Sequence, residues 1–221
     1  MPDRTLDERP ERQDPGARFW NRFADRYAAR PIKDEAAYEA LLADVAGRLH
    51  ATDRVLEIGC GTGGTAIRLA PHAARFTATD FSSEMVRIAK AKPAPDNLRF
   101  EVSDAGAALD RGPFDAVCAF NVLHLVDDLP ALLGRVHARL QPGGLLISKT
   151  WCFADLAFRL RLLFAVLRTA GLFPPAKSLG LTELRQAILD AGFEIIDQRV
   201  LGSRPQNPYI VARKPLLAVK S

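Results

Sequence analysis

Apolar positions follow two different patterns along the chain. Short apolar runs have the length and composition of buried strands, and they span residues 54–58, 76–80, 98–102, 114–120 and 145–148. Between them lie segments with apolar residues three or four positions apart, which is typical of amphipathic helices, near residues 63–71, 85–88 and 129–140. Strands that alternate strictly with helices predict a parallel, doubly wound α/β sheet.

Both ends of the chain add elements to this alternation. Before the first strand, the aromatic residues of segment 19–27 recur at helical spacing, and a second helical pattern covers 34–49. After the fifth strand, a helix over 181–191 is followed by two strand-like runs, 192–200 and 209–213, with turn residues but no helix between them. These two runs predict a C-terminal hairpin that places an antiparallel strand on the parallel sheet.

Length and composition fit one domain. The chain has 221 residues, of which 48% are hydrophobic, so it can bury a large core. Residues 1–16 are rich in charge and lack an apolar stretch, which predicts a disordered tail and no secretory signal. We expect a single domain over 17–221, with N-terminal helices at 17–50 and a helical insertion at 152–191, and a cytoplasmic location.

Charge and cysteine usage exclude several classes of partner. The net charge of +4 is modest, and no block of Lys and Arg alternates with aromatic residues, so we expect no nucleic-acid partner. Cys60, Cys118 and Cys152 are widely separated and lack the spacings that bind zinc, so we expect neither a disulfide nor a metal site.

The run over residues 55–64 carries the strongest chemical signal. It reads Val-Leu-Glu-Ile-Gly-Cys-Gly-Thr-Gly-Gly and joins a buried strand to a glycine-rich turn before a helix. A strand, a glycine turn and a helix N-terminus together form a nucleotide-sized site. The same spacing fits both a dinucleotide and a ligand that carries an amino acid and an adenosine, so the run alone leaves both open.

The order of motifs settles on one family. The chain resembles the class I S-adenosylmethionine-dependent methyltransferases over about residues 18–213. The motifs that carry this resemblance are 57–63, Asp80 at the end of the second strand, Asp104 after the third, 115–121 at the fourth, and 140–144 before the fifth. The resemblance implies a seven-stranded sheet that ends in the hairpin, with S-adenosylmethionine as cofactor.

Residues after the second and third strands match the family's adenosine-binding positions. Asp80 would accept hydrogen bonds from both ribose hydroxyls, although it could instead cap the next helix. Asp104, followed by Ala105, would hold the adenine amino group, with an ordinary turn as the alternative. Phe81 and Met85 would wall the adenine, and a core position for Met85 stays equally open.

Residues of the glycine turn and the fourth strand match the methionine end. By resemblance, Gly59, Gly61 and Gly63 face the methionine part of the ligand, and Asn121 approaches it from the fourth strand. Cys60, between two of these glycines, is also a candidate cofactor-binding residue. Glu57 either reaches the ligand amino group, orders the turn, or makes a purely structural hydrogen bond.

His124 is the candidate catalytic base. An imidazole changes protonation near neutral pH and could take a proton from an acceptor, while a structural hydrogen bond is the alternative. No Asn/Asp-Pro-Pro-aromatic sequence follows the fourth strand, since residues 121–124 read Asn-Val-Leu-His. In the family that this chain resembles, that sequence is typical of enzymes that methylate amides or amines of nucleic acids and proteins. Its absence here points to a small-molecule acceptor.

Segment 154–173 is too apolar for an ordinary exposed helix and too charged for a membrane-spanning one, because it contains Arg159, Arg161 and Arg168. Three interpretations stay open: a lid over a hydrophobic acceptor, a homodimer surface, or a helix in peripheral contact with a membrane.

We therefore predict an S-adenosylmethionine-dependent methyltransferase that acts on a small organic acceptor. An NAD-dependent oxidoreductase is the first alternative, disfavoured by the terminal hairpin and by the lack of a Tyr-x-x-x-Lys pair after the fourth strand. A non-catalytic protein that binds S-adenosylmethionine is the second.

Overall fold

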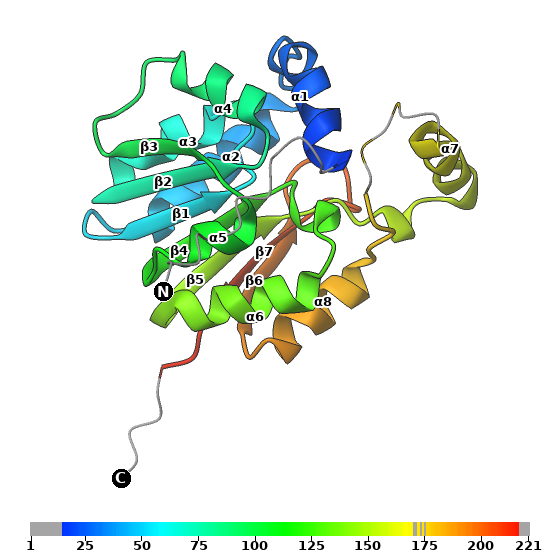
Figure 1. Cartoon of the computed structure of the whole chain (residues 1–221). Coiled ribbons are helices and arrows are strands. Elements are labelled where there is room, and N and C mark those ends of the chain that lie inside the picture. Colours follow the sequence, from blue (N-terminus) through cyan, green and yellow to red (C-terminus); the bar gives the residue numbers. More distant parts are fainter. Residues whose placement is uncertain (1–14, 170–171, 173, 175, 217–221) are drawn as a thin grey trace, which may run out of the picture.

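A computed structural model describes residues 15–169, 172, 174 and 176–216. Seven strands form one sheet in the order β3-β2-β1-β4-β5-β7-β6 (Figure 1). The strands are β1 (Arg54–Ile58), β2 (Arg75–Asp80), β3 (Leu98–Val102), β4 (Phe114–Phe120), β5 (Leu140–Lys149), β6 (Glu194–Val200) and β7 (Pro208–Arg213). Strands β1 to β5 pair in parallel, and β7 is antiparallel to both β5 and β6.

Helices connect the strands and cover both faces of the sheet. The α-helices are α1 (Pro15–Ala28), α2 (Glu35–Arg48), α3 (Gly64–Leu69), α4 (Ser83–Lys90), α5 (Ala105–Leu109), α6 (Leu129–Arg139), α7 (Phe158–Thr169) and α8 (Leu181–Asp190). Short 3₁₀ turns are η2 (Ala70–His72), η3 (Leu123–Leu125) and η4 (Phe153–Asp155). Acidic side chains cap the N-termini of α2 and α6. Asp34 accepts a hydrogen bond from Ala37 N at 3.0 Å, and Asp128 accepts one from Ala131 N at 3.0 Å.

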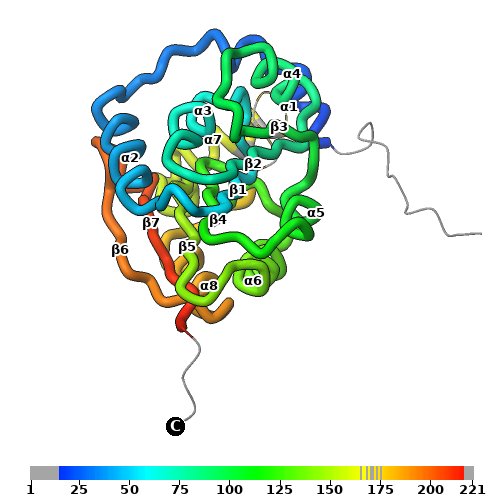
Figure 2. The backbone as a smooth tube through the Cα atoms, turned by 90° about the vertical axis from the view of Figure 1, so that its left-hand side faces the viewer, coloured from blue at the N-terminus to red at the C-terminus, as the bar shows by residue number. Residues whose placement is uncertain are grey.

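Two apolar cores sandwich the sheet, one on each face. One is built from residues of α2, α3 and α4 against one face of β1 and β4, with Val55 and Cys118 among its members. The other is built from α5, α6 and α8 against alternate positions, such as Leu56 and Val117. The two layers of helices lie on either side of the strands in Figure 2. Because both faces are covered, the central strands are apolar at nearly every position.

The strand order fixes where a ligand can bind. The chain runs outward from β1 to β3 and then returns to β4 on the other side of β1, so the strand order reverses between β1 and β4. Loops that leave the carboxyl ends of these two strands therefore diverge and leave a crevice between them.

The predicted fold class is confirmed, including the antiparallel hairpin of β6 and β7. The predicted start of the fifth strand at residue 145 is wrong, because β5 already begins at Leu140. The pairing of β5 with β4 shifts between Phe114 and Ala116, and Gly143 has φ +82° within the strand, so this segment forms a bulge. Residues 1–14 of the predicted tail lie outside the described residues, whereas 15 and 16 already belong to α1.

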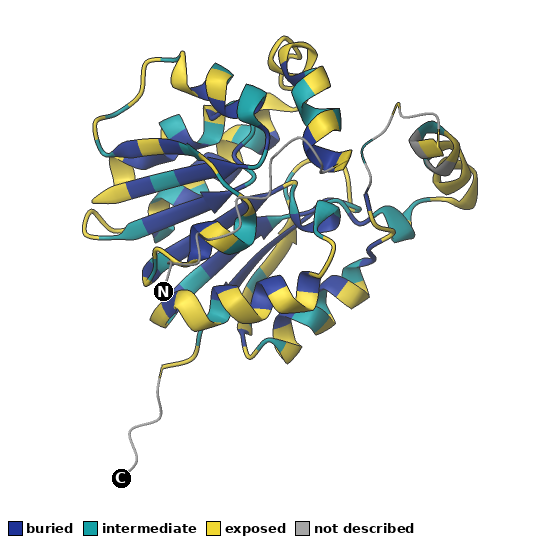
Figure 3. Cartoon of the chain, in the orientation of Figure 1, coloured by how far each residue is buried: buried dark blue, intermediate teal, exposed yellow. Residues whose placement is uncertain are grey.

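Helix α7 stands apart from the rest of the fold (Figure 1) and exposes most of its apolar residues (Figure 3). No helix in the described ranges is long and apolar enough to cross a membrane.

Candidate cofactor site at the glycine turn

The three alternate glycines of the turn after β1 share a left-handed backbone conformation but differ in the space around them. Gly59, Gly61 and Gly63 all have positive φ, at +68°, +54° and +78°. A Cβ on Gly59 would lie 2.5 Å from Val122 Cγ2, and one on Gly63 would lie 2.6 Å from Phe100 Cζ, so packing excludes side chains at both. At Gly61 the nearest atom would be 3.8 Å away, which leaves room for a ligand rather than for the protein.

Asp80, at the carboxyl end of β2, reaches across to this turn. One carboxylate oxygen accepts from Gly61 N at 2.8 Å and the other from Ser82 N at 2.9 Å. Burial raises the pKa of Asp80, and these two hydrogen bonds oppose the rise. Because each carboxylate oxygen can accept more than one hydrogen bond, Asp80 retains acceptor sites toward the crevice.

Glu57, near the end of β1 before the turn, forms no ion pair with any residue that the structure describes. It is 2% exposed, and its Oε2 has no hydrogen-bond partner among the described residues. Burial, together with the nearby Asp80, raises the pKa of Glu57 to about 8. Two buried acids without a cation fit a positively charged ligand, because such a ligand would supply the missing charge.

Helix α1 closes the turn from outside. The carbonyl oxygen of the Asn21 side chain accepts from Ser82 Oγ at 2.6 Å and so joins α1 to the loop after β2. Tyr27 lies beside Gly61, and the burial of its hydroxyl and the charge of Asp80 raise its pKa. From the other side, Lys92 Nζ donates to the carbonyl of Thr62 at 2.6 Å. We had not predicted roles for Asn21 or Lys92, which no local motif marks.

Asn121 follows β4 at the crevice in a strained conformation. Its φ is +55°, the only positive φ at a non-glycine position in the ranges that the structure describes. Its N–H donates to the carbonyl of Lys149 at 2.6 Å, which ties the ends of β4 and β5 together. Backbone strain of this kind concentrates at ligand-binding sites. The half-buried Lys149, whose pKa burial lowers, was not singled out from the sequence.

The remaining predicted cofactor residues lie in different environments. Asp104 is exposed, and its Oδ1 accepts from Ala107 N at 2.9 Å, so it caps α5, whose first residue is Ala105. Met85 is buried, whereas Phe81 is half-buried beside Asp80 in the chain. Cys60 is also buried, which raises the pKa of its thiol and leaves it neutral. The adenine contacts of these residues stay predictions.

His124 belongs to a cluster of rings at the ends of β4 and β5. It is 5% exposed, its Nδ1 has no hydrogen-bond partner among the described residues, and burial lowers its pKa to about 4. Its ring lies 5.3 Å from that of Phe153, which stacks on Trp151 at 5.9 Å and touches Phe164 of α7 at 5.6 Å. The cluster therefore connects the crevice to α7.

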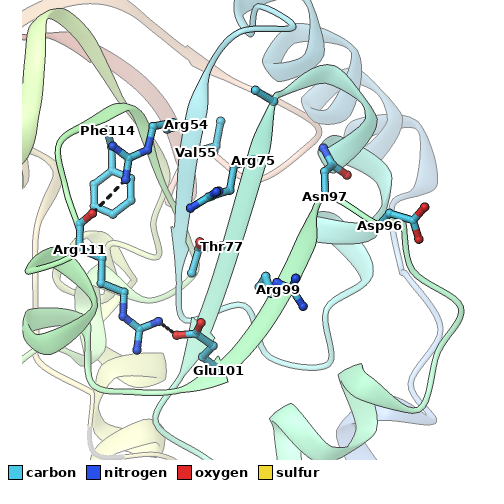
Figure 4. Close-up of a pocket in the computed structure, with 11 residues that line it drawn as sticks. Arg54, Val55, Arg75, Thr77, Asp96, Asn97, Arg99, Glu101, Arg111 and Phe114 are labelled. Carbon is cyan, nitrogen blue, oxygen red and sulfur yellow. Dashed lines mark hydrogen bonds and ion pairs between the residues drawn. The ribbon is translucent and has the colours of Figure 1, made fainter.

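A second hollow, of about 500 Å³, lies at the amino ends of β1 and β2 (Figure 4). Four arginines line it: Arg54, Arg75, Arg99 and Arg111. Arg111 pairs with Glu101, and Arg54 Nη2 donates to the carbonyl of Arg111 at 3.1 Å. Because it adjoins the amino ends of the strands, this hollow is separate from the glycine turn and Asp80.

Comparison with known proteins gives the family. The family described as "Methyltransferase domain" matches residues 22–198, which include the glycine turn, Asp80 and Asn121. The chain belongs to this family. That membership confirms the predicted family, and S-adenosylmethionine is the cofactor of these methyltransferases. The buried acids and the open space at Gly61 fit this cationic ligand.

Relatives share the domain but differ in size. The chain is 35% identical over 158 residues to a biotin biosynthesis bifunctional protein, BioCD, of Bordetella avium, covering 68% of this chain and 31% of that protein. It is 31% identical over 139 residues to a ubiquinone biosynthesis O-methyltransferase of Xanthomonas oryzae, covering 61% and 55%. The solved DhpI complex with SAH has the same fold, with a TM-score of 0.70 at 22% identity over 91% of this chain and 96% of that one.

We expect Gly61→Ala to weaken cofactor binding far more than it weakens the fold. The left-handed backbone at Gly61 would cost about 1–2 kcal/mol of stability with a Cβ present, while that Cβ would occupy the space left for the ligand. Thermal unfolding and calorimetric titration with S-adenosylhomocysteine would measure both effects. Gly134→Ala is the control: it lies within α6 with nothing near its Cβ position, so it should gain about 0.5–1 kcal/mol. Unchanged affinity in Gly61→Ala would contradict the assignment.

Proposed function

We propose that this protein transfers the methyl group of S-adenosylmethionine to a small, largely apolar organic acceptor held at the carboxyl ends of β4 and β5. The observation that carries this proposal is the pair of buried acids, Glu57 and Asp80, beside a glycine turn that leaves open space at Gly61. These groups would hold the cofactor. The ring cluster of His124, Trp151, Phe153 and Phe164 would hold the acceptor.

Different residues would bind different parts of the cofactor, Glu57 by charge and the others by hydrogen bonds. S-adenosylmethionine supplies a methyl group on a sulfonium, which is already an activated leaving group. We place Glu57 toward the ligand's ammonium group, since its Oε2 has no hydrogen-bond partner in the described ranges. Asp80 would accept from the ribose hydroxyls, Asp104 from the adenine amino group, and Asn121 would approach the methionine end.

The acceptor class follows from the walls of the crevice. Trp151 and Phe153 present stacked rings, and the Arg204 guanidinium lies 5.4 Å from the Trp151 ring centroid. Ring walls favour flat or apolar molecules, because they bury much apolar area with few polar groups. The name of the Xanthomonas O-methyltransferase, which concerns a small molecule, agrees with this class.

Positioning and removal of water supply much of the acceleration in such a reaction, because the acceptor attacks the methyl carbon in line with the sulfur. A hydroxyl acceptor also needs a base. His124 fits that role in part: burial keeps its imidazole neutral above about pH 5, so it can accept a proton, although a pKa of about 4 makes it a weak base.

Asp80→Asn tests the cofactor assignment. We expect it to weaken binding of S-adenosylhomocysteine about 10- to 100-fold, since hydrogen bonds to a charged group contribute about 1–3 kcal/mol. Isothermal titration calorimetry measures the affinity, and Asp110→Asn, at an exposed carboxylate that pairs with Arg135 and Arg139, is the matched control. Equal affinity in both variants would mean that Asp80 does not face the ligand.

His124→Gln tests the catalytic role. If His124 acts as a base on a hydroxyl acceptor, the variant should bind S-adenosylhomocysteine normally yet transfer labelled methyl groups at least about 100-fold more slowly. The measurement is the transfer of label from S-adenosylmethionine to small molecules of a cell extract at saturating cofactor. Unchanged transfer by the variant would exclude the base. No labelled product with the native protein would favour the non-catalytic binding protein.

A further inference from the structure

Helix α7 carries an apolar stripe that nothing in the described structure covers. Phe158, Leu162 and Val166 are 75%, 57% and 56% exposed. They are four residues apart, so they lie above one another on one face of the helix. Leu160 and Leu163 are also exposed, as is Leu172 just beyond the helix. The three side chains of the stripe, with Leu163 next to Val166 on the helix surface, form an exposed apolar surface of the kind that is buried in use.

The opposite side of α7 is the one that faces the protein. Phe164, which packs on Phe153, projects away from the stripe, as the 3.6-residue turn requires. The half-buried Leu167 is also separated from the stripe. The body of the protein therefore contacts the side of α7 that does not carry the stripe, and a lid over the crevice would need the helix to turn over.

The charges around the stripe indicate which kind of partner could cover it. Residues 156–182 contain Arg159, Arg161, Arg168 and Lys177 and no Asp or Glu. Arg159 and Arg161 flank the stripe on its two sides, and in the described part of the chain neither guanidinium pairs with a carboxylate. Two copies joined stripe to stripe would bring these cations together without an acid between them, which opposes a dimer through this face.

We propose that α7 lies in the surface of a membrane that contains anionic phospholipids. The stripe would insert between the acyl chains near the headgroups, while the flanking arginines extend to the lipid phosphates. This contact needs no methyl transfer, so it stands or fails apart from the proposed function. The ring cluster that joins α7 to the crevice would then place the acceptor site next to the lipid surface.

Flotation of the full chain with vesicles tests the proposal. We expect the protein to float with vesicles of phosphatidylcholine mixed with phosphatidylglycerol, to float weakly with phosphatidylcholine alone, and to lose binding as salt rises. Replacing Phe158, Leu162 and Val166 together by Ser should lower the bound fraction about tenfold or more, and so should Arg159→Glu with Arg161→Glu. All of these side chains are exposed, so the melting temperature should stay unchanged.

Two matched controls distinguish binding through α7 from nonspecific hydrophobic or electrostatic adsorption to the vesicles. The triple change Ile32→Ser, Leu189→Ser and Val200→Ser removes exposed apolar side chains elsewhere. The pair Arg75→Glu and Arg99→Glu removes cations from the hollow at the other end of the sheet. Both controls should float like the native chain.

Three results would overturn the proposal. One is the absence of flotation with anionic vesicles. Another is an equal loss of flotation in the controls. The third is a dimer, seen by size-exclusion chromatography with light scattering, that the Ser changes in the stripe convert to a monomer, because a second copy would then be what covers the stripe.

Discussion

Burial of Glu57 beside Asp80, with no cation paired to either carboxyl group in the part of the chain that the structure describes, is the constraint on which the site depends. A carboxyl group in this position keeps its proton up to about pH 8. The unfolded chain would release that proton near its ordinary pKa of 4.5. The folded state therefore binds more protons than the unfolded state between these values, and the free energy of unfolding falls as pH rises through this window. A cationic ligand that pairs with ionised Glu57 would offset the loss.

The fold shows how the protein holds the buried Glu57 carboxyl group at the ligand site. Parallel strands buried on both faces bring the ends of β1, β2 and β4 to one edge, where the strand order reverses. Val122 packs against Gly59 and Phe100 against Gly63, while the position of a Cβ at Gly61 has no atom nearer than 3.8 Å. Helix α1 contacts the loop after β2 through Asn21, and α7 contacts the ring cluster through Phe164.

Periodicity predicted the sheet well because both of its faces are covered, so each strand is a continuous apolar run flanked by turn residues. The hairpin could be predicted since no helical segment separates its two strands. The bulge in β5 could not, because Pro142 and Gly143 signal a turn locally and only pairing with β4 keeps them in the strand. Helix α5 was missed for a similar reason: a five-residue helix capped by Asp104 has no periodicity to detect.

Local sequence marked the glycine turn and Asp80 as candidates, and the structure brings them together through the hydrogen bond from Gly61 N to Asp80. Contacts between distant segments could not be predicted in this way. Asn21 reaches Ser82 from 61 positions away, and Lys92 holds Thr62 from 30 away. The positive φ of Asn121 likewise depends on its bond to Lys149 on the neighbouring strand. The sequence reveals which residues favour turns and strands, but not which partners meet at the crevice.

The most direct test of the account is a titration of the Glu57 carboxyl carbon by ¹³C NMR, with and without S-adenosylmethionine. A Glu57→Gln variant assigns the signal. The account predicts a pKa near 8 in the free protein and a marked fall when the cationic cofactor binds. A Glu57 that titrates at its ordinary value in the free protein, or whose pKa does not respond to the cofactor, would contradict the central claim.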